Sequence, residues 1–489
     1  MSQNSKVLIV GSGGNAIAIA ARLQQEGIDY RIITAHSEFG GTWFINRYPG
    51  CGVDTPAAIY QFGFALNANW SHTYPAQSEV YEYLCSLAKD YRLYEKTDFN
   101  TEMTACSWDS EAQSWAVDTT SNGRYFAQHL VLATGFLDVP IDGRIPGRDV
   151  FTGRIFHSQQ WPEGYTGQGD RMAVVGSGSS ALQIVPAMQA VAASVKVFQR
   201  TPTWVMPMNN HTFSEDERQQ FAANQDLLLQ ARTEEDARRS SFFRTLNGSG
   251  PERDAQLEIM TAKALQYLEE QVPDPELRKL LTPDHNLGCK RPGHSDKWYQ
   301  ALQQPNVELV PEAAAEITER EIISLSGRSF EVDTIVLATG FHWGTHILNR
   351  VHRRDGQSVA DAQAGHPRAY KGLMVSQCPN LYLVGGSGPN CRTAGNGLRT
   401  GEITSSYVVK SIEYMDKIGV RALEVREEAE TAWKRRADEV NATGVSSTGE
   451  CTNYVSDKFG NNMADWPGDE RDQTAAMNQF VAGDYQEPV

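Results

Sequence analysis

Two stretches of the chain share one order of apolar, glycine-rich and helix-forming residues. Residues 6–25 begin with KVLIV, continue with GSGGNA and end in a helix-forming run. Residues 172–192 begin with MAVV, continue with GSGSSA and end in the same way. A short apolar run before a glycine turn predicts a buried strand of a parallel sheet, and the run after it predicts a helix that packs on that strand.

Both stretches match the strand–GxGxxA–helix unit that binds dinucleotides. The glycines let the backbone approach a pyrophosphate, and the helix N-terminus offers free N–H groups and the positive end of its dipole. The residues concerned are Gly11, Gly13 and Ala16 in the first stretch and Gly176, Gly178, Ser179 and Ser180 in the second. One such turn also occurs in unrelated α/β folds, but two in the same strand–helix context favour two nucleotide sites.

Two further apolar runs, at residues 130–136 and 335–341, end in the same Ala-Thr-Gly-Phe sequence. Each predicts a strand that closes a nucleotide-binding unit. Their positions indicate nesting, in which residues 1–145 form the first part of one domain, residues 146–334 form a second domain, and residues 335–489 complete the first.

The composition changes between about residues 212 and 285, where Glu, Arg, Gln, Leu and Ala dominate. This spacing predicts a helical insertion in the second domain. Residues 424–442 predict another helix on the surface. The expected fold class is therefore α/β, with two Rossmann-like domains and a helical insertion.

The charge and the cysteines limit the partners of the chain. With 60 acidic and 44 basic residues among 489, the net charge is −16, which excludes a nucleic-acid partner. No apolar run approaches the length of a membrane span, and the apolar run near the N-terminus is too short for a signal peptide. The seven cysteines are scattered, which predicts reduced thiols in the cytoplasm, and none has the spacing of a metal site.

The segment between the two nucleotide units carries a specific fingerprint. Residues 151–162, FTGRIFHSQQWP, match FxGxxxHxxxWP at all five fixed positions. This fingerprint resembles that of the Baeyer–Villiger flavin monooxygenases. The resemblance extends over most of the chain, including GGTWFINRYPG at 40–50, QRTP at 199–202 and CKRP at 289–292. In that family His157 resembles a linker residue that supports domain motion, so no proton transfer is assigned to it.

The resemblance implies that FAD binds the first domain and NADPH the second. On the FAD side it implies contacts from Gly41, Thr42, Trp43, Asp54, Tyr60, Met103 and Asn390, and on the NADPH side from Gln183, Arg200, Thr201 and Lys290. Arg200 follows Gly176 by 24 positions, the interval at which a guanidinium can bind the 2′-phosphate of NADPH. From spacing alone, Arg200 and Lys290 could equally be solvated surface charges.

The resemblance also implies catalytic roles for Arg291 and Asp54. Arg291 occupies the position of a cation that stabilises an anionic flavin C4a-peroxide, and Asp54 the position of its partner carboxylate. The alternative is a structural ion pair. The implied reaction uses NADPH and O₂ and inserts one oxygen atom beside the carbonyl of a small ketone substrate, which gives an ester or lactone.

Two positions depart from the family pattern. Thr34 stands where an acid usually binds the ribose of FAD, so FAD binds less tightly or Glu38 reaches in. Asn453 stands where a related branch carries tryptophan, which weakens analogies about the substrate pocket.

Three alternative functions remain at this point. N-hydroxylation or S-oxygenation would use the same cofactors, although Asp54 with Arg291 favours the ketone reaction. A pyridine nucleotide–disulfide reductase needs a CxxxxC pair after the first unit, where only Cys51 lies. A nucleotide-sensing protein without activity leaves the fingerprint and Arg291 unexplained.

Overall fold

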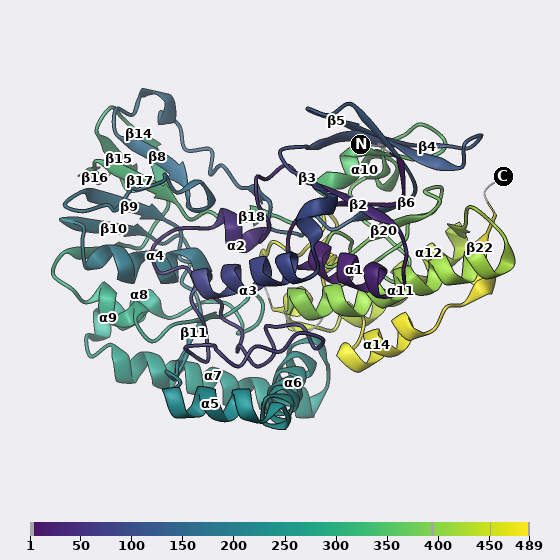
Figure 1. Ribbon diagram of the computed structural model, residues 1–489. Helices are drawn as coiled ribbons and strands as arrows, with labels where there is room; N and C mark the ends of the chain where they lie inside the picture. Colours follow the sequence, from purple (N-terminus) through teal and green to yellow (C-terminus); the bar gives the residue numbers. More distant parts are fainter. Residues whose placement is uncertain (1–3, 393–395, 450, 488–489) are drawn as a thin grey trace.

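Two separate β-sheets organise the chain, one on each side of the molecule, with a layer of helices beneath them (Figure 1). The computed structural model describes residues 4–392, 396–449 and 451–487. The two sheets and the helical layer confirm the α/β class and the helical insertion that the sequence predicts.

The first sheet draws its strands from both ends of the chain. Its order is β19-β4-β5-β6-β1-β2-β3, and β20 also pairs with β6. These strands are β1 (Asn4–Val10), β2 (Tyr30–Ile33), β3 (Thr97–Asp98), β4 (Met103–Asp109), β5 (Ser114–Thr119), β6 (Arg124–Leu132), β19 (Val351–His352) and β20 (Leu381–Leu383). Helices α1 (Gly14–Gln25), α3 (Gln77–Asp90) and α11 (Gly397–Ile418) pack together beside this sheet and bury their apolar faces in one core.

The second sheet is entirely parallel, in the order β13-β10-β9-β17-β8. Its strands are β8 (Arg154–His157), β9 (Arg171–Val175), β10 (Ser194–Phe198), β13 (Val307–Val310) and β17 (Thr334–Leu337). Helices α4 (Ser179–Gln189) and α9 (Trp298–Leu302) pack against it. An antiparallel sheet follows, with β14 (Ala314–Ile317), β15 (Glu321–Ser324) and β16 (Ser329–Glu331).

The return to the first sheet comes later than the sequence places it. The sequence predicts this return at about residue 335, but β17 lies between β9 and β8 in the second sheet. The chain re-enters the first sheet at β19. The apolar run of β17 fits the centre of either parallel sheet, so its pattern does not reveal which sheet it joins. Between the sheets, β7 (Val139–Pro140) pairs with β18 (Phe341–His342).

The two glycine turns have the same construction. Gly11 and Gly176 have φ angles of 125° and 126°. A Cβ at Gly11 would lie 2.4 Å from the carbonyl oxygen of Ala133, and one at Gly176 would lie 2.3 Å from that of Ala338. Each Ala-Thr-Gly segment therefore passes directly against the glycine turn of its own sheet, and only glycine leaves room for it.

The helical insertion lies below both sheets in Figure 1. It consists of α5 (Glu215–Ala223), α6 (Gln225–Asn247), α7 (Pro251–Gln271) and α8 (Pro275–Leu281). From α6, Arg232 donates from Nη1 to the carbonyl oxygen of Gln61 at 2.8 Å and lies 3.6 Å from the carboxylate of Glu402. The insertion thus contacts the first unit as well as the second.

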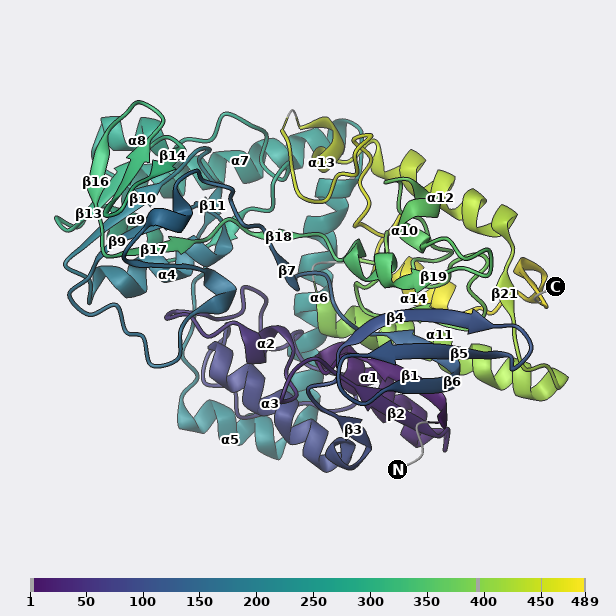
Figure 2. The same ribbon diagram turned by 90° about the horizontal axis from the view of Figure 1, so that it is seen from above.

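The C-terminal part returns to the insertion after crossing the first unit. Helix α12 (Glu427–Asn441) confirms the helix predicted at 424–442, and the short α13 (Val445–Thr448) lies beside α6 when the molecule is seen from above (Figure 2). The remaining short elements are α2 (Thr42–Ile45), α10 (Val359–Gln363), α14 (Glu470–Asn478), β11 (Val205–Met206), β12 (Gly293–His294), β21 (Glu424–Val425) and β22 (Tyr485–Gln486).

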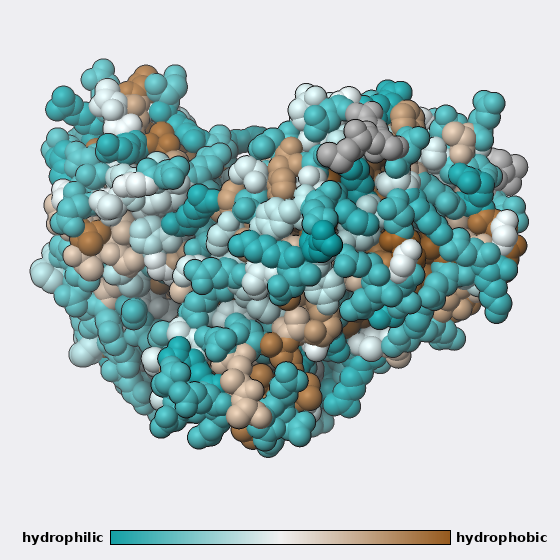
Figure 3. All heavy atoms as spheres, viewed as in Figure 1, coloured by the Kyte–Doolittle hydropathy of each residue, from teal (hydrophilic) through white to brown (hydrophobic). Residues whose placement is uncertain are grey.

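Polar side chains cover most of the face seen in Figure 3, with apolar ones in small separate groups and a notch between the two lobes at its upper edge. Among the described residues, no helix combines the length and the apolar character that a membrane crossing requires.

Candidate active site

A cavity of about 450 Å³ lies where the two units, the helical insertion and the C-terminal segment meet. Its wall includes side chains from α6, from residues 288–294, from residues 446–465 and from the loop after α2. Arg291 and Asp54, the two predicted catalytic residues, both line this cavity.

Arg291 and Asp54 form an ion pair across 237 positions of sequence. The Nη2 atom of Arg291 donates to Oδ1 of Asp54 at 2.6 Å. Burial alone would raise the pKa of Asp54, but the guanidinium of Arg291, with smaller contributions from His294 and Arg239, holds that pKa below its usual value. The carboxylate is therefore ionised at neutral pH, and it leaves the Arg291 side chain 34% exposed to the cavity.

Two cavity residues escaped the sequence reasoning. His294 lies on β12 and Arg239 lies on α6, and both line the cavity. Burial lowers the pKa of His294 to about 4, so its ring is neutral at physiological pH. Burial and then the nearby Arg291 lower the pKa of Arg239 to about 10. Neither residue belongs to a recognisable local pattern, so only folding identifies them.

The first glycine turn fits the phosphates of FAD. Helix α1 begins after Gly13 without a side-chain cap or an acidic residue in its first turn, so its N–H groups are available to an anion. The predicted flavin loop packs directly on this turn, because a Cβ at Gly41 would lie 2.7 Å from the Cα of Gly13. Ala16 is buried in the core beneath.

The flavin loop positions an aromatic pair and starts a short helix. Thr42 begins α2 and is exposed, whereas Trp43 is buried. The indole Nε1 of Trp43 donates to the hydroxyl of Tyr60 at 3.0 Å, and the two rings meet edge to face. Burial raises the pKa of Tyr60 to about 12, so this phenol stays protonated and can donate onward.

Thr34 and Glu38 are the two residues that the sequence places near the ribose of FAD. Thr34 follows β2 directly, and its hydroxyl lies 2.9 Å from that of Ser12. Glu38 accepts from the phenol of Tyr94 at 2.6 Å and from the backbone N–H of Phe39 at 2.8 Å, both at Oε1. These contacts engage one carboxylate oxygen of Glu38 within the protein.

The second glycine turn fits the phosphates of NADPH. Helix α4 begins after Gly178 without a side-chain cap, and a Cβ at Gly178 would meet nothing within 4 Å. Ser179, at the start of α4, is exposed, and Ser180 is partly so. The open space at this helix N-terminus is what an anionic group requires.

Arg200 and Lys290 interact electrostatically although 90 positions separate them. Burial and then the charge of Arg200 lower the pKa of Lys290, and the charge of Asp284 opposes this shift more weakly. Thr201 accepts at its carbonyl from the hydroxyl of Ser177 at 2.9 Å, which fixes the start of this segment.

Three predicted cofactor residues have contacts within the protein. Gln183 accepts from the hydroxyl of Tyr48 at 2.9 Å and donates to the carbonyl of Gly52 at 2.9 Å, which joins α4 to the flavin loop. Asn390 donates to the carbonyls of Asn462 and Asp465. Met103 is buried in the core of the first sheet.

His157 joins the second sheet to the link between the units. Its Nδ1 accepts from the backbone N–H of Gln159, and its Nε2 lies 3.0 Å from the carbonyl of Gly340, just before β18. Burial lowers its pKa, so the ring is neutral and donates through Nε2. This contact fits a linker residue.

The cysteines correct one expectation. The scattered positions of the cysteines predict reduced thiols, but the structure joins Cys289 and Cys451 in a disulfide. The two lie 162 positions apart, so no spacing rule connects them. Cys51, Cys85, Cys106, Cys378 and Cys391 are free. No group of residues in the described part of the chain has the composition of a metal site.

Comparisons with known proteins agree with this geometry. A family model described as pyridine nucleotide-disulphide oxidoreductase matches residues 8–235, which span both glycine turns. Among solved structures, cyclohexanone monooxygenase from Rhodococcus sp. Phi1 bound to NADP⁺ is 25% identical, with a TM-score of 0.89 over 100% of this chain and 99% of that one. A closed structure of cyclohexanone monooxygenase is 26% identical, with a TM-score of 0.88 over 100% of both chains.

Two curated relatives match almost the full length. A Baeyer–Villiger monooxygenase of Pseudomonas aeruginosa is 33% identical over 99% of this chain and 92% of its own length. A Baeyer–Villiger monooxygenase of Streptomyces coelicolor is 34% identical over 99% of this chain and 93% of its own length. With both nucleotide turns, the fingerprint and the Arg291–Asp54 pair in place, the chain belongs to the Baeyer–Villiger monooxygenases.

Proposed function

We propose that this enzyme inserts one oxygen atom of O₂ next to the carbonyl of a small ketone, which yields an ester or lactone, and that it works in the cytoplasm. The observation that carries the proposal is the Arg291–Asp54 pair on the wall of a cavity between two nucleotide-binding units. FAD and NADPH supply hydride transfer and the activation of O₂, and the protein supplies binding, orientation and electrostatics.

Each of the two units would hold one cofactor at a helix N-terminus. The N-termini of α1 and α4 bind the pyrophosphates of FAD and NADPH through backbone N–H groups. Arg200 and Lys290 bind the 2′-phosphate that distinguishes NADPH from NADH. Thr34 bonds the FAD ribose through a hydroxyl.

Arg291 supplies a fixed positive charge where negative charge develops on the reacting oxygen. Asp54 holds the guanidinium in place through the 2.6 Å bond and stays ionised because Arg291 lowers its pKa. Burial lowers the pKa of His294 beside this pair to about 4, so this ring is not a cationic proton donor to the reacting oxygen at neutral pH. An unprotonated oxygen is a nucleophile, which suits attack on a carbonyl carbon rather than on a sulfide or amine.

The test is a panel of ketones, sulfides and amines with purified, flavin-loaded enzyme. NADPH oxidation, O₂ uptake and product mass are measured together. We expect ketones to give products heavier by one oxygen atom, with NADPH and O₂ consumed in equal amounts. Oxygenation of sulfides or amines with no ketone product would overturn the proposal, and so would protein that binds no flavin.

A further inference from the structure

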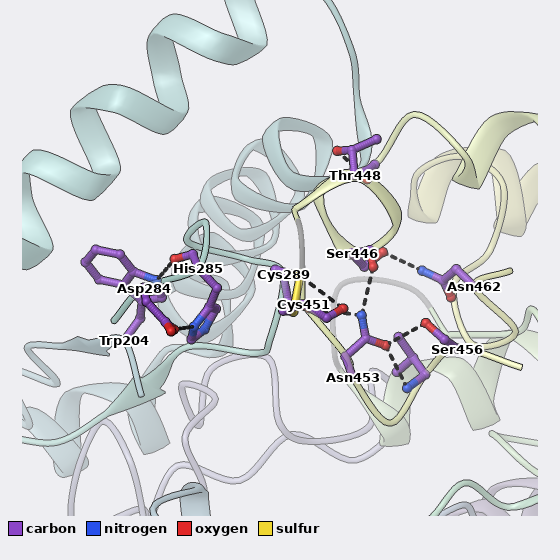
Figure 4. Close-up of a disulfide and its surroundings, with 12 residues drawn as sticks. Trp204, Asp284, His285, Cys289, Ser446, Thr448, Cys451, Asn453, Ser456 and Asn462 are labelled. Carbon is purple, nitrogen blue, oxygen red and sulfur yellow. Dashed lines mark hydrogen bonds and ion pairs between the residues drawn. A yellow bond between two sulfur atoms is a disulfide. The ribbon is translucent and has the colours of Figure 1, made fainter. Parts of the chain in front are cut away.

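The disulfide joins the catalytic loop to the C-terminal segment. Cys289 lies two residues before Arg291, and Cys451 follows α13 in the segment whose Asn453 and Tyr454 also line the cavity; Figure 4 shows the bond between them. Cys289 itself lines the cavity and is 2% exposed, whereas Cys451 is partly exposed. Cys289 is therefore the buried member of the pair at the cavity wall, and Cys451 is the more exposed member.

The contacts around the bond keep the two sulfurs together without it. Asn453 donates from Nδ2 to the carbonyl of Cys289 at 3.2 Å and to that of Ser446 at 2.8 Å (Figure 4). A Cβ at Gly449 would lie 2.6 Å from the Cβ of Cys289, so the segment packs closely on this cysteine. After reduction, these contacts hold the two thiols within reach of each other, so the bond can form again quickly.

We propose that Cys289 and Cys451 are a redox-reactive pair, oxidised by the hydrogen peroxide that this enzyme releases when O₂ reduction is not coupled to substrate oxygenation. The proposal rests on the proposed function, which supplies the oxidant. Uncoupled turnover converts NADPH, H⁺ and O₂ into NADP⁺ and hydrogen peroxide, so the peroxide arises in the cavity that Cys289 lines.

The chemistry is balanced at both steps. The Cys289 thiol loses its proton, and the thiolate attacks one oxygen of the peroxide. The O–O bond breaks, Cys289 becomes a sulfenic acid, and the leaving hydroxide takes up the released proton to give water. The Cys451 thiol then attacks that sulfur, which forms the disulfide and releases a second water. In total, two thiols are oxidised and one peroxide is reduced to two waters, and a dithiol reverses the change by exchange.

The bond has a defined effect on the cavity. The disulfide fixes the segment that carries Asn453 and Tyr454 against the loop that carries Arg291, so the wall stays closed. With the bond reduced, the contacts of Asn453 and Gly449 hold that wall less firmly than the covalent bond does, so brief opening admits water and lets peroxide leave. Oxidation by leaked peroxide therefore closes the cavity and reduces further leakage.

The first experiment tests the reaction of the pair and does not depend on turnover. Enzyme reduced with a dithiol and freed of it should show all seven thiols in denaturant, and one equivalent of added peroxide should leave five, with Cys289 and Cys451 linked in the peptide map. Cys451→Ser should form no link, while Cys85→Ser, which changes a free cysteine on α3, should behave like the wild type. Peroxide that leaves this pair unlinked overturns the proposal.

The second experiment tests the source of the oxidant and the effect of the bond. Reduced enzyme given NADPH and O₂ without ketone should form the same link, and catalase should slow it. The ratio of ester formed to NADPH oxidised should be lower in the dithiol form by roughly two-fold, equivalent to about 0.4 kcal/mol. Cys451→Ser should stay at the lower ratio with or without dithiol. An equal ratio of ester to oxidised NADPH in the disulfide and dithiol forms would overturn the proposed effect of the bond on the cavity. Absence of ester in both forms would contradict the proposed function and leave the reaction of the cysteine pair with peroxide to the first experiment.

Discussion

The Arg291 guanidinium lies 2.6 Å from the Asp54 carboxylate, yet one third of its side chain stays open to the cavity. That partial exposure leaves room for a reacting group to approach the cation while the carboxylate holds it. At the residue scale, the function depends on which charged side chains remain accessible to a ligand when the others are engaged in contacts within the protein.

Replacing Arg291 should separate NADPH oxidation from product formation. Arg291→Ala should retain flavin and still oxidise NADPH, but the rate of ester formation should fall on the order of 10²–10³-fold, the usual cost of losing one preorganised electrostatic contact. Stopped-flow mixing of the reduced enzyme with O₂, with ester and hydrogen peroxide measured in parallel, checks this. Arg291→Lys, which keeps the charge but loses the planar fork, should lie in between. A normal ester yield from Arg291→Ala would identify another cation as the essential one.

Arg200 should determine the choice of coenzyme. Arg200→Ala removes a charge-assisted contact to the 2′-phosphate. The resulting loss of kcat/KM for NADPH should correspond to about 2–3 kcal/mol of transition-state stabilisation, while kcat/KM for NADH stays nearly constant. Steady-state kinetics with both coenzymes measures the difference. Lys290→Ala should act in the same direction, because the charge of Arg200 acts on Lys290. An equal loss with both coenzymes would remove Arg200 from phosphate binding.

Thr34 should limit the affinity for FAD. Thr34→Glu restores a carboxylate at the ribose position and should tighten FAD binding by about 1.5–3 kcal/mol, whereas Thr34→Val should weaken it by about 1 kcal/mol. Titration of flavin-free protein with FAD, followed by flavin fluorescence, gives both dissociation constants. If the folded Glu variant binds FAD less tightly than the wild type, the ribose is held by another group.

At the element scale, the same turn serves two purposes at neighbouring glycines. Gly176 lies against the carbonyl of Ala338 with a positive φ, so it makes the strand-to-helix turn possible. Gly178 faces open space at the start of α4 with an ordinary φ of −84°, so it leaves room for a ligand. One glycine is needed for folding and the other for binding.

This difference gives a matched pair of substitutions. In Gly176→Ala, backbone strain alone should lower the free energy of unfolding by about 1–3 kcal/mol. The close contact between the new Cβ and the carbonyl oxygen of Ala338 should lower it further. Gly178→Ala should leave the thermal unfolding midpoint unchanged and raise the KM for NADPH. Thermal unfolding and coenzyme kinetics on both variants separate the two roles. Similar stability of the two variants would contradict the close contact at Gly176.

At the scale of the whole molecule, buried and partly buried charges join the helical insertion to the first unit. Asp236 and Arg232 lie on α6, while Arg399 and Glu402 lie on α11. Arg399 pairs with Glu402 at 3.0 Å, and Arg232 lies 3.6 Å from the same carboxylate. Burial raises the pKa of Asp236 to about 6, and Glu470 adds to the rise. In this interface, the Asp236 carboxyl group therefore ionises less readily in the folded protein than in the unfolded chain.

The stability of this interface should depend on pH in a defined direction. Because the folded state holds the proton of Asp236 more tightly than the unfolded chain does, the free energy of unfolding falls as pH rises from about 4 to about 6. Asp236→Asn should remove this loss and stabilise the protein at neutral pH by up to about 3 kcal/mol, with little change near pH 4. Thermal unfolding of both proteins across this range is the measurement. A variant that is less stable than the wild type at neutral pH would show that the ionised carboxylate is stabilising.

The sequence by itself determined the features that depend on local backbone geometry. Gly11 and Gly176 could be identified because a strand, a tight turn and a helix N-terminus require glycine at fixed intervals. The helical insertion followed from composition and spacing. The fingerprint at 151–162 identified the family, and with it the positions of Arg291 and Asp54.

The tertiary structure decided every feature that depends on contact between distant segments. Strand β17 lies in the second sheet, where it pairs with β8 on one side and β9 on the other. Arg239 and His294 reach the cavity, and Cys289 meets Cys451 across 162 positions, because packing brings their segments together. Local patterns record the conformation of a few neighbouring residues, whereas these contacts follow from how whole elements bury their apolar faces, which spacing along the chain does not encode.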